Sequence, residues 1–251
     1  MRLFRVAKEL AGYVSHYPRR LLSPALRART NASRWERELA AQTSWRDAYA
    51  QARFSQDYTA GRGYLWWGAC QPDRDRIRDY LELGSWEGQS AVFAAWLFPE
   101  ARITAVDWFS NEDANARFDH NTRPFEGRLE KTAGTTWDVL NRLGGEGRRF
   151  DVIYIDADHR FDTVLLDTVL SWPLLRPGGY LIWDDYLWSA PDWPANLNPK
   201  PAVDSWLASR ADSVEVVFAG EQICVRKLRD DPVLQDMSGR PTWTGVAEMA
   251  A

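Results

Sequence analysis

From residue 80 onward, short apolar runs alternate with segments whose apolar residues recur at helical spacing. This alternation is typical of an α/β fold in which helices cover both faces of a mostly parallel sheet. We expect seven strands, at 80–84, 102–107, 128–134, 150–156, 178–185, 214–220 and 222–228. We expect helices between them at about 88–98, 135–143, 160–173 and 200–210, with Pro99 and Pro177 as stops after the first and the third.

The last two of these strands are separated by Glu221 alone. One residue is too short for a crossover helix, so we expect the two strands to pair antiparallel. The predicted architecture is therefore a doubly wound, seven-stranded, mostly parallel sheet that closes with an antiparallel hairpin.

The segments on either side of the predicted sheet lack strand alternation. The N-terminal segment shows candidate helices near 3–16, 33–53 and 73–79, and the C-terminal segment contains prolines and glycines without periodicity. We therefore divide the chain into a helical N-terminal cap (1–79), a sheet domain (80–228) and an extended C-terminal tail (229–251).

Composition agrees with a globular protein. The chain has 251 residues, of which 45 % are hydrophobic, and this length fits one large domain with appendages. The two cysteines, Cys70 and Cys224, lie far apart and not in any metal-ligand spacing, so neither a disulfide framework nor a zinc site is indicated. No apolar run has the length of a membrane span, and we expect a reducing, cytoplasmic location.

Positive charge is concentrated at the N-terminus, where residues 1–37 hold nine Lys or Arg and two Glu. The rest of the chain is acidic, which argues against nucleic acid as the main partner. Apolar residues recur at helical spacing among the first sixteen residues. This segment either packs on its own domain as a helix or contacts a membrane surface or a partner protein. A homo-oligomer is also compatible with the sequence.

Ligands of an open parallel sheet bind outside the carboxyl ends of the strands. The first strand ends in "ELGSWEGQS", where Gly84 and Gly88 flank a tight turn that lets a ligand approach the backbone. The turn lacks the extra glycine of a dinucleotide site, which weakens an interpretation as an NAD-dependent oxidoreductase. Asp107 ends the second strand, where a carboxylate accepts hydrogen bonds from the ribose of an adenosine-containing cofactor.

Four motifs in this order resemble those of the class I methyltransferases that use S-adenosylmethionine: "YLELGSWEGQS", "ITAVDW", "TAGTTWDVL" and "LLRPGGYLIWDD". The resemblance spans residues 80–228 and includes the closing antiparallel hairpin, which sets the methyltransferase sheet apart from the dinucleotide-binding one. It implies a Rossmann-like methyltransferase fold and S-adenosylmethionine as the cofactor.

The resemblance places the methionine and ribose part of the cofactor along the first turn and its ribose on Asp107. Glu82 lies inside an apolar strand and needs a partner, such as a turn amide or the cofactor ammonium. Trp108 either lies against the adenine or belongs to the core. The cofactor-binding residues that we expect are Glu82, Gly84, Ser85, Gly88, Ser90, Asp107, Trp108, Gly134 and Thr135.

The fourth and fifth strands end in "YIDADH" and "WDDY", so Asp156, Asp158, His159, Asp184 and Asp185 are expected to converge at one edge of the sheet. Four carboxylates in one place repel one another, and a divalent cation relieves this repulsion while supplying a Lewis acid. Oxygen ligands favour Mg²⁺, or Mn²⁺, over zinc. The structural alternatives are a helix cap for Asp158 and His159 and a solvated turn for Asp185.

This pattern resembles the metal-dependent O-methyltransferases of the catechol and caffeoyl-coenzyme A type, and more closely the bacterial sugar and macrolide-sugar O-methyltransferases. The resemblance assigns the metal to Asp156, Asp184 and Asp185. His159 stands where the catechol-type enzymes have a lysine as general base, and a histidine is suitable because its ordinary pKa is about 6.5. Without a metal, Asp158 or His159 would take the proton.

The sequence therefore predicts methyl transfer from S-adenosylmethionine to a hydroxyl of a sugar, a polysaccharide or another small natural product, with a divalent metal ion. The loops at 121–128 and 187–201 are rich in Trp, Pro, Asn and Arg, and we expect them to shape the acceptor pocket, with Trp188 and Trp193 placed to stack on a ring. Two other interpretations stay open: an NAD-dependent oxidoreductase on a similar sheet, and a non-catalytic binding protein that retains the fold.

Overall fold

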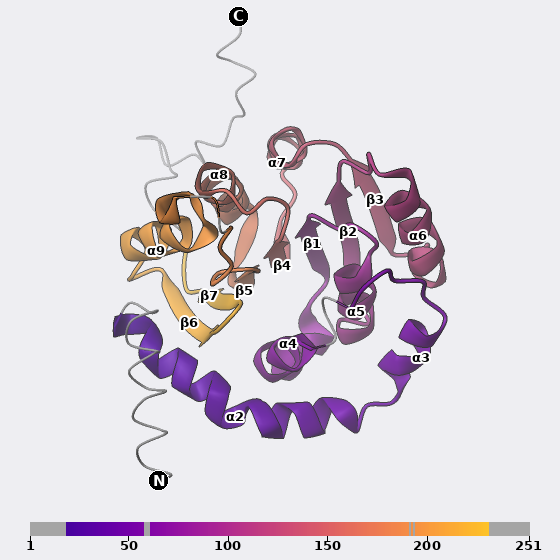
Figure 1. Ribbon diagram of the computed structural model, residues 1–251, viewed down its shortest axis with the longest axis horizontal. Helices are drawn as coiled ribbons and strands as arrows, with labels where there is room; N and C mark the ends of the chain where they lie inside the picture. The colour runs from indigo at the N-terminus through magenta and orange to yellow at the C-terminus, as the bar shows by residue number, and fades with distance from the viewer. Residues whose placement is uncertain (1–18, 58–60, 191, 193, 231–251) are drawn as a thin grey trace, which may run out of the picture.

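A computed structural model describes residues 19–57, 61–190, 192 and 194–230. All seven expected strands are present and form one sheet (Figure 1). They are β1 (Asp79–Leu83), β2 (Arg102–Asp107), β3 (Leu129–Ala133), β4 (Phe150–Ile155), β5 (Leu175–Trp183), β6 (Val214–Ala219) and β7 (Ile223–Lys227). The predicted fold class is confirmed.

The strand order is β3-β2-β1-β4-β5-β7-β6. The first five strands run parallel, and β7 pairs antiparallel with β6, as the short connection at Glu221 predicts, and also with β5. The connection between β6 and β7 comprises Gly220, Glu221 and Gln222. The chain moves outward in one direction from β1 to β3 and then returns to place β4 on the other side of β1. The carboxyl ends of β1 and β4 therefore form the topological switch point at which ligands bind in such sheets.

Helices cover both faces of the sheet (Figure 1). The α-helices are α2 (Leu22–Ala40), α3 (Ser44–Ala50), α4 (Gly63–Cys70), α5 (Gln89–Leu97), α6 (Glu112–Thr122), α7 (Thr136–Gly145), α8 (Phe161–Ser171) and α9 (Pro199–Ser209). The short 3-10 helices are η1 (Arg19–Leu21), η2 (Gln71–Arg76), η3 (Arg123–Phe125), η4 (Trp172–Leu174) and η5 (Ala195–Leu197).

Alternate strand residues enter two separate cores. In β4, Ile153 and Ile155 pack with α7, α8 and α9, whereas Val152 and Tyr154 face the core that contains α4 and α5. Successive strand side chains point to opposite faces, which explains the near-continuous apolar runs of these doubly covered strands. The same alternation directs Tyr154 to one face of the sheet, next to the strand end that carries Asp156.

Several helices differ from the sequence expectation. The predicted helix at 33–53 is two helices, α2 and α3, and the segment predicted as helical at 73–79 is the 3-10 helix η2 followed by β1. Helices α4 and α6 were not expected. Pro177 lies within β5, so it is not the stop after α8; that helix ends at Ser171, just before the 3-10 helix that contains Pro173.

The polar sequence of α6 explains why its helical pattern is weak. Only Ala114 and Phe118 contribute buried apolar side chains, one turn apart, while the rest of the helix is largely polar. Its beginning is fixed by Asn111, whose side chain accepts a hydrogen bond from the backbone N–H of Ala114 at 3.0 Å.

Some sequence predictions fall outside the described residues: the basic helix at 3–16, Trp193 and the tail beyond Asp230. None of the helices within the described part of the chain is long and apolar enough to cross a membrane.

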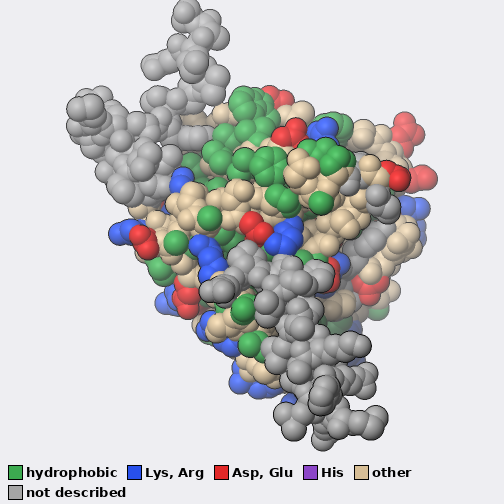
Figure 2. Space-filling model, turned by 60° about the vertical axis from the view of Figure 1, so that its left-hand side comes forward, with side chains coloured by type: hydrophobic (Ala, Val, Ile, Leu, Met, Phe, Trp, Pro, Cys, Tyr) green, Lys and Arg blue, Asp and Glu red, His purple; other side chains and the backbone are tan. Residues whose placement is uncertain are grey.

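On the side of the molecule that carries α8 and α9, hydrophobic side chains gather in one area of the surface (Figure 2).

Candidate active site

A cavity of about 610 Å³ opens at the carboxyl edge of the sheet. Its walls come from the segments that follow β1, β2, β4 and β5, which is where the topology predicts a ligand site. The lining residues are Arg62, Gly84, Ser85, Trp86, Glu87, Gln89, Ser90, Asp107, Asp156, Ala157, His159, Asp184, Asp185 and Trp188. Nine of the residues singled out from the sequence are therefore brought together: Gly84, Ser85, Ser90, Asp107, Asp156, His159, Asp184, Asp185 and Trp188.

The turn after β1 requires glycine at position 84. The φ angle of Gly84 is +86°, and a Cβ placed there would lie 2.2 Å from the backbone oxygen of Asp156. The turn therefore packs directly against the end of β4. Gly88, with φ of +78°, precedes α5 as its N-cap residue and so ends the turn in a left-handed conformation.

Asp107 shapes this turn from the neighbouring strand. Its Oδ2 accepts hydrogen bonds from the backbone N–H groups of Ser85 and Trp86 at 3.0 and 2.9 Å, and its Oδ1 accepts one from Phe109 at 2.9 Å. A carboxylate oxygen has more than one lone pair, so Oδ1 retains acceptor capacity toward the cavity that Asp107 lines.

Glu82 is a fully buried acid in β1, two residues before Gly84. Its Oε2 accepts a hydrogen bond from the Tyr80 hydroxyl at 2.8 Å, whereas Oε1 is buried without a hydrogen-bond partner among the described residues. Burial raises the pKa of Glu82 to about 7, although the hydroxyls of Tyr80, Ser85 and Ser90 oppose the rise. A cationic ligand group at this place would satisfy the unpaired oxygen. Glu82 therefore fits the ammonium group of S-adenosylmethionine, and the close turn at Gly84 fits its methionine part, which approaches the backbone.

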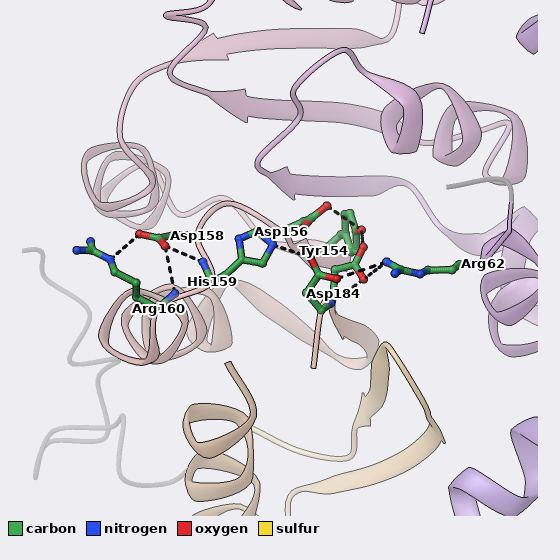
Figure 3. Close-up of polar contacts among 8 residues, drawn as sticks. Arg62, Tyr154, Asp156, Asp158, His159, Arg160 and Asp184 are labelled. Atoms are coloured by element: carbon green, nitrogen blue, oxygen red, sulfur yellow. Dashed lines mark hydrogen bonds and ion pairs between the residues drawn. The ribbon is translucent and has the colours of Figure 1, made fainter. Parts of the chain in front are cut away.

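Tyr154 joins two acids of the opposite half of the cavity (Figure 3). Its hydroxyl lies 3.0 Å from Oδ2 of Asp156 and also contacts Oδ2 of Asp184. Burial raises the pKa of Asp156 well above its usual range, and the negative charges of Asp184 and Asp185 add to this rise. Negative charge is thus concentrated at the ends of β4 and β5.

His159 pairs with Asp185. Their side chains approach to 2.5 Å between Nε2 and Oδ2, and this hydrogen bond is the main reason why the pKa of His159 is raised. The imidazole lies against the Trp188 ring, with 4.8 Å between the ring centroids. Asp185 has a φ of +50°, a left-handed conformation that is uncommon for a residue other than glycine and often marks a functional site.

Arg62 reaches the acids from the N-terminal side of α4 (Figure 3). Its Nη1 donates to Oδ1 of Asp184 at 2.7 Å and lies 3.6 Å from Oδ1 of Asp185. This arginine was not expected from the sequence, because Arg62 stands in an irregular segment with no motif around it. Tyr154 was not expected either, although a residue two positions before Asp156 points to the same face of the strand.

The donor atoms at this edge fit a divalent cation. One ligand atom each from Asp156, His159 and Asp185 lies within 4.8 Å of the others, and two carboxylates with one imidazole are suitable donors. Asp184 is engaged differently, since it accepts hydrogen bonds from Arg62, Tyr154 and the backbone N–H of Asp185. The residues whose donor atoms converge in the structure are thus Asp156, His159 and Asp185. The set expected from the sequence has Asp184 in place of His159.

Asp158 does not line the cavity. Its carboxylate accepts hydrogen bonds from the backbone N–H groups of His159 and Arg160, at 2.6 and 3.1 Å, and from the Arg160 side chain at 3.1 Å (Figure 3). These bonds lower the pKa of Asp158. Asp158 therefore organises the turn just before α8, whose N-cap residue is Arg160, and is not itself the helix cap.

The remaining predicted cofactor residues lie beside the cavity or outside it. Trp108 follows β2 and is 69 % exposed, so it is not a core residue. Gly134 and Thr135 follow β3, where the Thr135 hydroxyl accepts a hydrogen bond from the backbone N–H of Asp138 at 3.1 Å and begins α7. Trp108, Gly134 and Thr135 share the carboxyl edge of the sheet with Asp107 without joining its cavity.

Comparison with known proteins agrees with this geometry. Residues 81–186 match a family model described as a methyltransferase domain. No curated protein sequence matches the chain.

Solved structures share the fold at low sequence identity. The O-methyltransferase TomG from Streptomyces achromogenes, involved in tomaymycin synthesis and in complex with SAM, is 19 % identical, with a TM-score of 0.56 over 69 % of this chain and 82 % of TomG. The MycE methyltransferase of the mycinamycin pathway, in complex with Mg, SAH and mycinamycin VI, is 18 % identical, with a TM-score of 0.56 over 75 % of this chain and 54 % of MycE. An O-methyltransferase from Bacillus cereus in complex with SAH is 17 % identical, with a TM-score of 0.55 over 82 % of this chain and 99 % of that chain.

The family match covers the glycine turn, the acid at the end of β2 and both acidic strand ends, and the sheet closes with the antiparallel hairpin that the resemblance implies. The resemblance that the motifs predict is therefore confirmed. The segment from Leu81 to Tyr186 is a methyltransferase domain, and its fold is that of the class I methyltransferases.

Proposed function

We propose that this protein is an S-adenosylmethionine-dependent O-methyltransferase that acts on a hydroxyl of a sugar or another small natural product. The observation that carries the proposal is one cavity with two different ends. One end is lined by the close glycine turn, with Glu82 buried two residues before Gly84 and one of its oxygens unpaired among the described residues, and the other end is lined by the His159–Asp185 pair. A cofactor and an acceptor can thus meet between a cation-binding end and a proton-accepting end.

The glycine-turn end has the features needed to hold the cofactor. Gly84 and Ser85 let the methionine part approach the backbone, Glu82 receives its ammonium group, and Asp107 accepts a hydrogen bond from the ribose through Oδ1. The proposed adenine side lies along the sheet edge toward Trp108, Gly134 and Thr135. Bound S-adenosylmethionine supplies an electrophilic methyl group on its sulfonium.

The opposite end prepares the acceptor. In the neutral tautomer that donates from Nε2 to Asp185, the His159 ring has its lone pair on Nδ1. We assign this nitrogen to accept the proton of the acceptor hydroxyl as the oxygen bonds to the methyl carbon and the carbon–sulfur bond breaks. Asp185 orients the imidazole and stabilises its charged form, and Trp188 packs on the ring.

A divalent cation, Mg²⁺ or Mn²⁺, belongs to the proposal as a Lewis acid that lowers the pKa of the acceptor hydroxyl. Asp156 and Asp185 are shared by the set expected from the sequence and by the set that converges in the structure. Support for a metal ion comes from this donor set and from the Mg present in the MycE complex.

Natural-product chemistry is the favoured acceptor class because TomG and MycE act in such pathways. The match covers 54 % of the MycE chain, so the acceptor of that enzyme is not transferred to this chain. An NAD-dependent oxidoreductase is not favoured, because the glycine turn, the closing hairpin and the family match all point to methyl transfer. The cytoplasmic location, the homo-oligomer and the membrane or partner contact of the N-terminus stay predictions.

Methyl transfer is tested with a panel of glycosylated and catechol acceptors, with products detected by mass spectrometry. We expect a product heavier by one methyl group, formed only with S-adenosylmethionine. Excess EDTA is expected to suppress turnover, and added Mg²⁺ to restore it, while affinity for S-adenosylhomocysteine changes little. Full turnover in EDTA would remove the metal ion from the proposal and leave His159 as the base. Absence of transfer to every acceptor, together with absence of cofactor binding, would contradict the proposed function.

Cofactor affinity is expected to depend on the ionisation of Glu82. Its pKa is raised to about 7, and an ammonium group is bound by the ionised form, so affinity should rise with pH up to about 7 and then level off. If binding requires complete ionisation, the rise approaches about tenfold per pH unit. Titrations of S-adenosylhomocysteine at several pH values measure this profile. Glu82→Gln should flatten it, whereas Glu130→Gln, on an exposed position of β3, should not; an equal profile in Glu82→Gln would refute the assignment.

A further inference from the structure

Both side-chain oxygens of Asp184 are occupied by protein donors, and one of these donors is a cation. Arg62 and the backbone N–H of Asp185 donate to Oδ1, each at 2.7 Å, and the Tyr154 hydroxyl contacts Oδ2. The Asp184 side chain is 8 % exposed, so little water competes for these bonds. Two donors occupy both lone pairs of Oδ1, so a ligand that needs this oxygen must first displace one of them.

Arg62 is the cation among those donors. Its guanidinium lies against Asp184 and 3.6 Å from Asp185, and it lines the same cavity as Asp156 and His159 (Figure 3). These acids keep the Arg62 guanidinium charged, since they raise its pKa against the effect of burial. The position that a metal ion would share with Asp184 therefore already has a positive charge beside it.

From this geometry we infer that Arg62 is an internal counter-cation that competes with a divalent cation for Asp184. With Arg62 in place, the edge is partly neutralised and stable without a metal ion. A divalent cation gains Oδ1 of Asp184 as a ligand only if the Arg62 guanidinium moves away from that oxygen. This inference rests on the divalent cation of the proposed function and names the residue that sets its affinity.

The predicted effect follows from Coulomb's law. Removing the positive charge frees the Asp184 carboxylate and removes the repulsion between the guanidinium and the metal ion. At a separation of about 4 Å, the energy of this repulsion lies between that of two charges in water and that of two charges near a protein surface. A tenfold gain in affinity lies within this range. Arg62→Gln should therefore bind Mn²⁺ about tenfold more tightly than the wild-type protein, and Arg62→Lys, which keeps the charge, within about threefold of it.

The test is a titration of the full chain with Mn²⁺ alone, with free ion followed by electron paramagnetic resonance. Arg160→Gln is the matched control, because Arg160 also pairs with an acid close to the site, Asp158, but neither residue lines the cavity. It should change Mn²⁺ affinity less than about twofold. Circular dichroism checks that each variant is folded, and Arg62→Met, which also removes the charge, replaces Arg62→Gln if the latter is not folded.

A second background separates competition for Asp184 from a general charge effect. In Asp184→Asn protein, the acid that Arg62 occupies is gone, so the additional Arg62→Gln change should improve Mn²⁺ affinity by no more than about threefold. An equal gain in both backgrounds would make Arg62 a distant charge and overturn the inference. Unchanged or weaker Mn²⁺ binding in Arg62→Gln would overturn it too.

The outcome is distinguishable from failure of the proposed function. If neither the wild-type protein nor any variant binds Mn²⁺, the inference is overturned. The transferase proposal then depends on S-adenosylhomocysteine binding and methyl transfer in EDTA, which are measured separately. If S-adenosylhomocysteine does not bind either, the proposed function fails as well.

Discussion

Replacing His159 by glutamine is expected to lower kcat for methyl transfer by roughly 10²–10⁴, the usual range for removal of a general base. Glutamine keeps a polar side chain next to Asp185 but has no nitrogen that can accept a proton. Because Asp185 raises the pKa of His159, the wild-type rate should fall as the pH drops through a value above 6.5. The variant should lack this inflection and recover part of its rate at alkaline pH.

His120→Gln is the matched control for this prediction. His120 is half-buried on α6, where its Nε2 lies 3.1 Å from the backbone oxygen of Gln51, and it does not line the cavity. It should leave kcat unchanged. Mn²⁺ affinity measured on the same variants decides the role of His159. A loss equal to that of Asp156→Asn would make His159 a metal ligand and contradict its assignment as the base.

Gly84→Ala is expected to destabilise the protein by about 3 kcal/mol or more. The left-handed φ of Gly84 costs an alanine about 1–2 kcal/mol, and the added Cβ, 2.2 Å from the Asp156 oxygen, adds an overpacking cost of about 1–3 kcal/mol. For a chain of this size the Tm should fall by roughly 6–12 °C. The turn and β4 must separate to admit the methyl group, so S-adenosylhomocysteine affinity should fall as well.

Gly147→Ala separates the two contributions to this cost. Gly147 has a φ of +68°, but nothing lies within 4 Å of a Cβ built there. Thermal unfolding of this variant should report the backbone cost alone, about 1–2 kcal/mol, with cofactor affinity unchanged. Equal stability losses in Gly84→Ala and Gly147→Ala would show that the contact with Asp156 is not tight.

The sheet was predictable because its strands are buried on both faces. Each parallel strand reads as a continuous apolar run, and the connection between β6 and β7, one residue in the prediction and three in the structure, is short enough only for a hairpin. Helix α6 was not predictable in the same way, because a helix that buries only Ala114 and Phe118 as apolar residues has almost no periodic signal.

The candidate site was predictable to the extent that it lies on strand ends. The carboxyl ends of β4 and β5 are neighbours, so Asp156, Asp184 and Asp185 were expected together from their positions alone. The hydrogen bonds of the site do not follow from such positions. Arg62 meets Asp184 across 122 residues of sequence, and Asp107 binds the amides of the glycine turn, which a motif does not reveal.

The sequence likewise did not predict that His159, in place of Asp184, converges with Asp156 and Asp185. Adjacent acids in sequence need not act alike, because the left-handed conformation of Asp185 turns the two side chains to different partners. Asp184 meets Arg62 and Tyr154, whereas Asp185 meets His159. Side-chain direction at a strained turn depends on tertiary contacts that a sequence motif does not encode.

The central claim, that the cavity between the Gly84 turn and His159 binds S-adenosylmethionine, is tested most directly by calorimetric titration of the full chain with S-adenosylhomocysteine, with NAD titrated in parallel. We expect saturable binding of one S-adenosylhomocysteine per chain and no binding of NAD. Binding of NAD in preference to S-adenosylhomocysteine, or of neither compound, would contradict it.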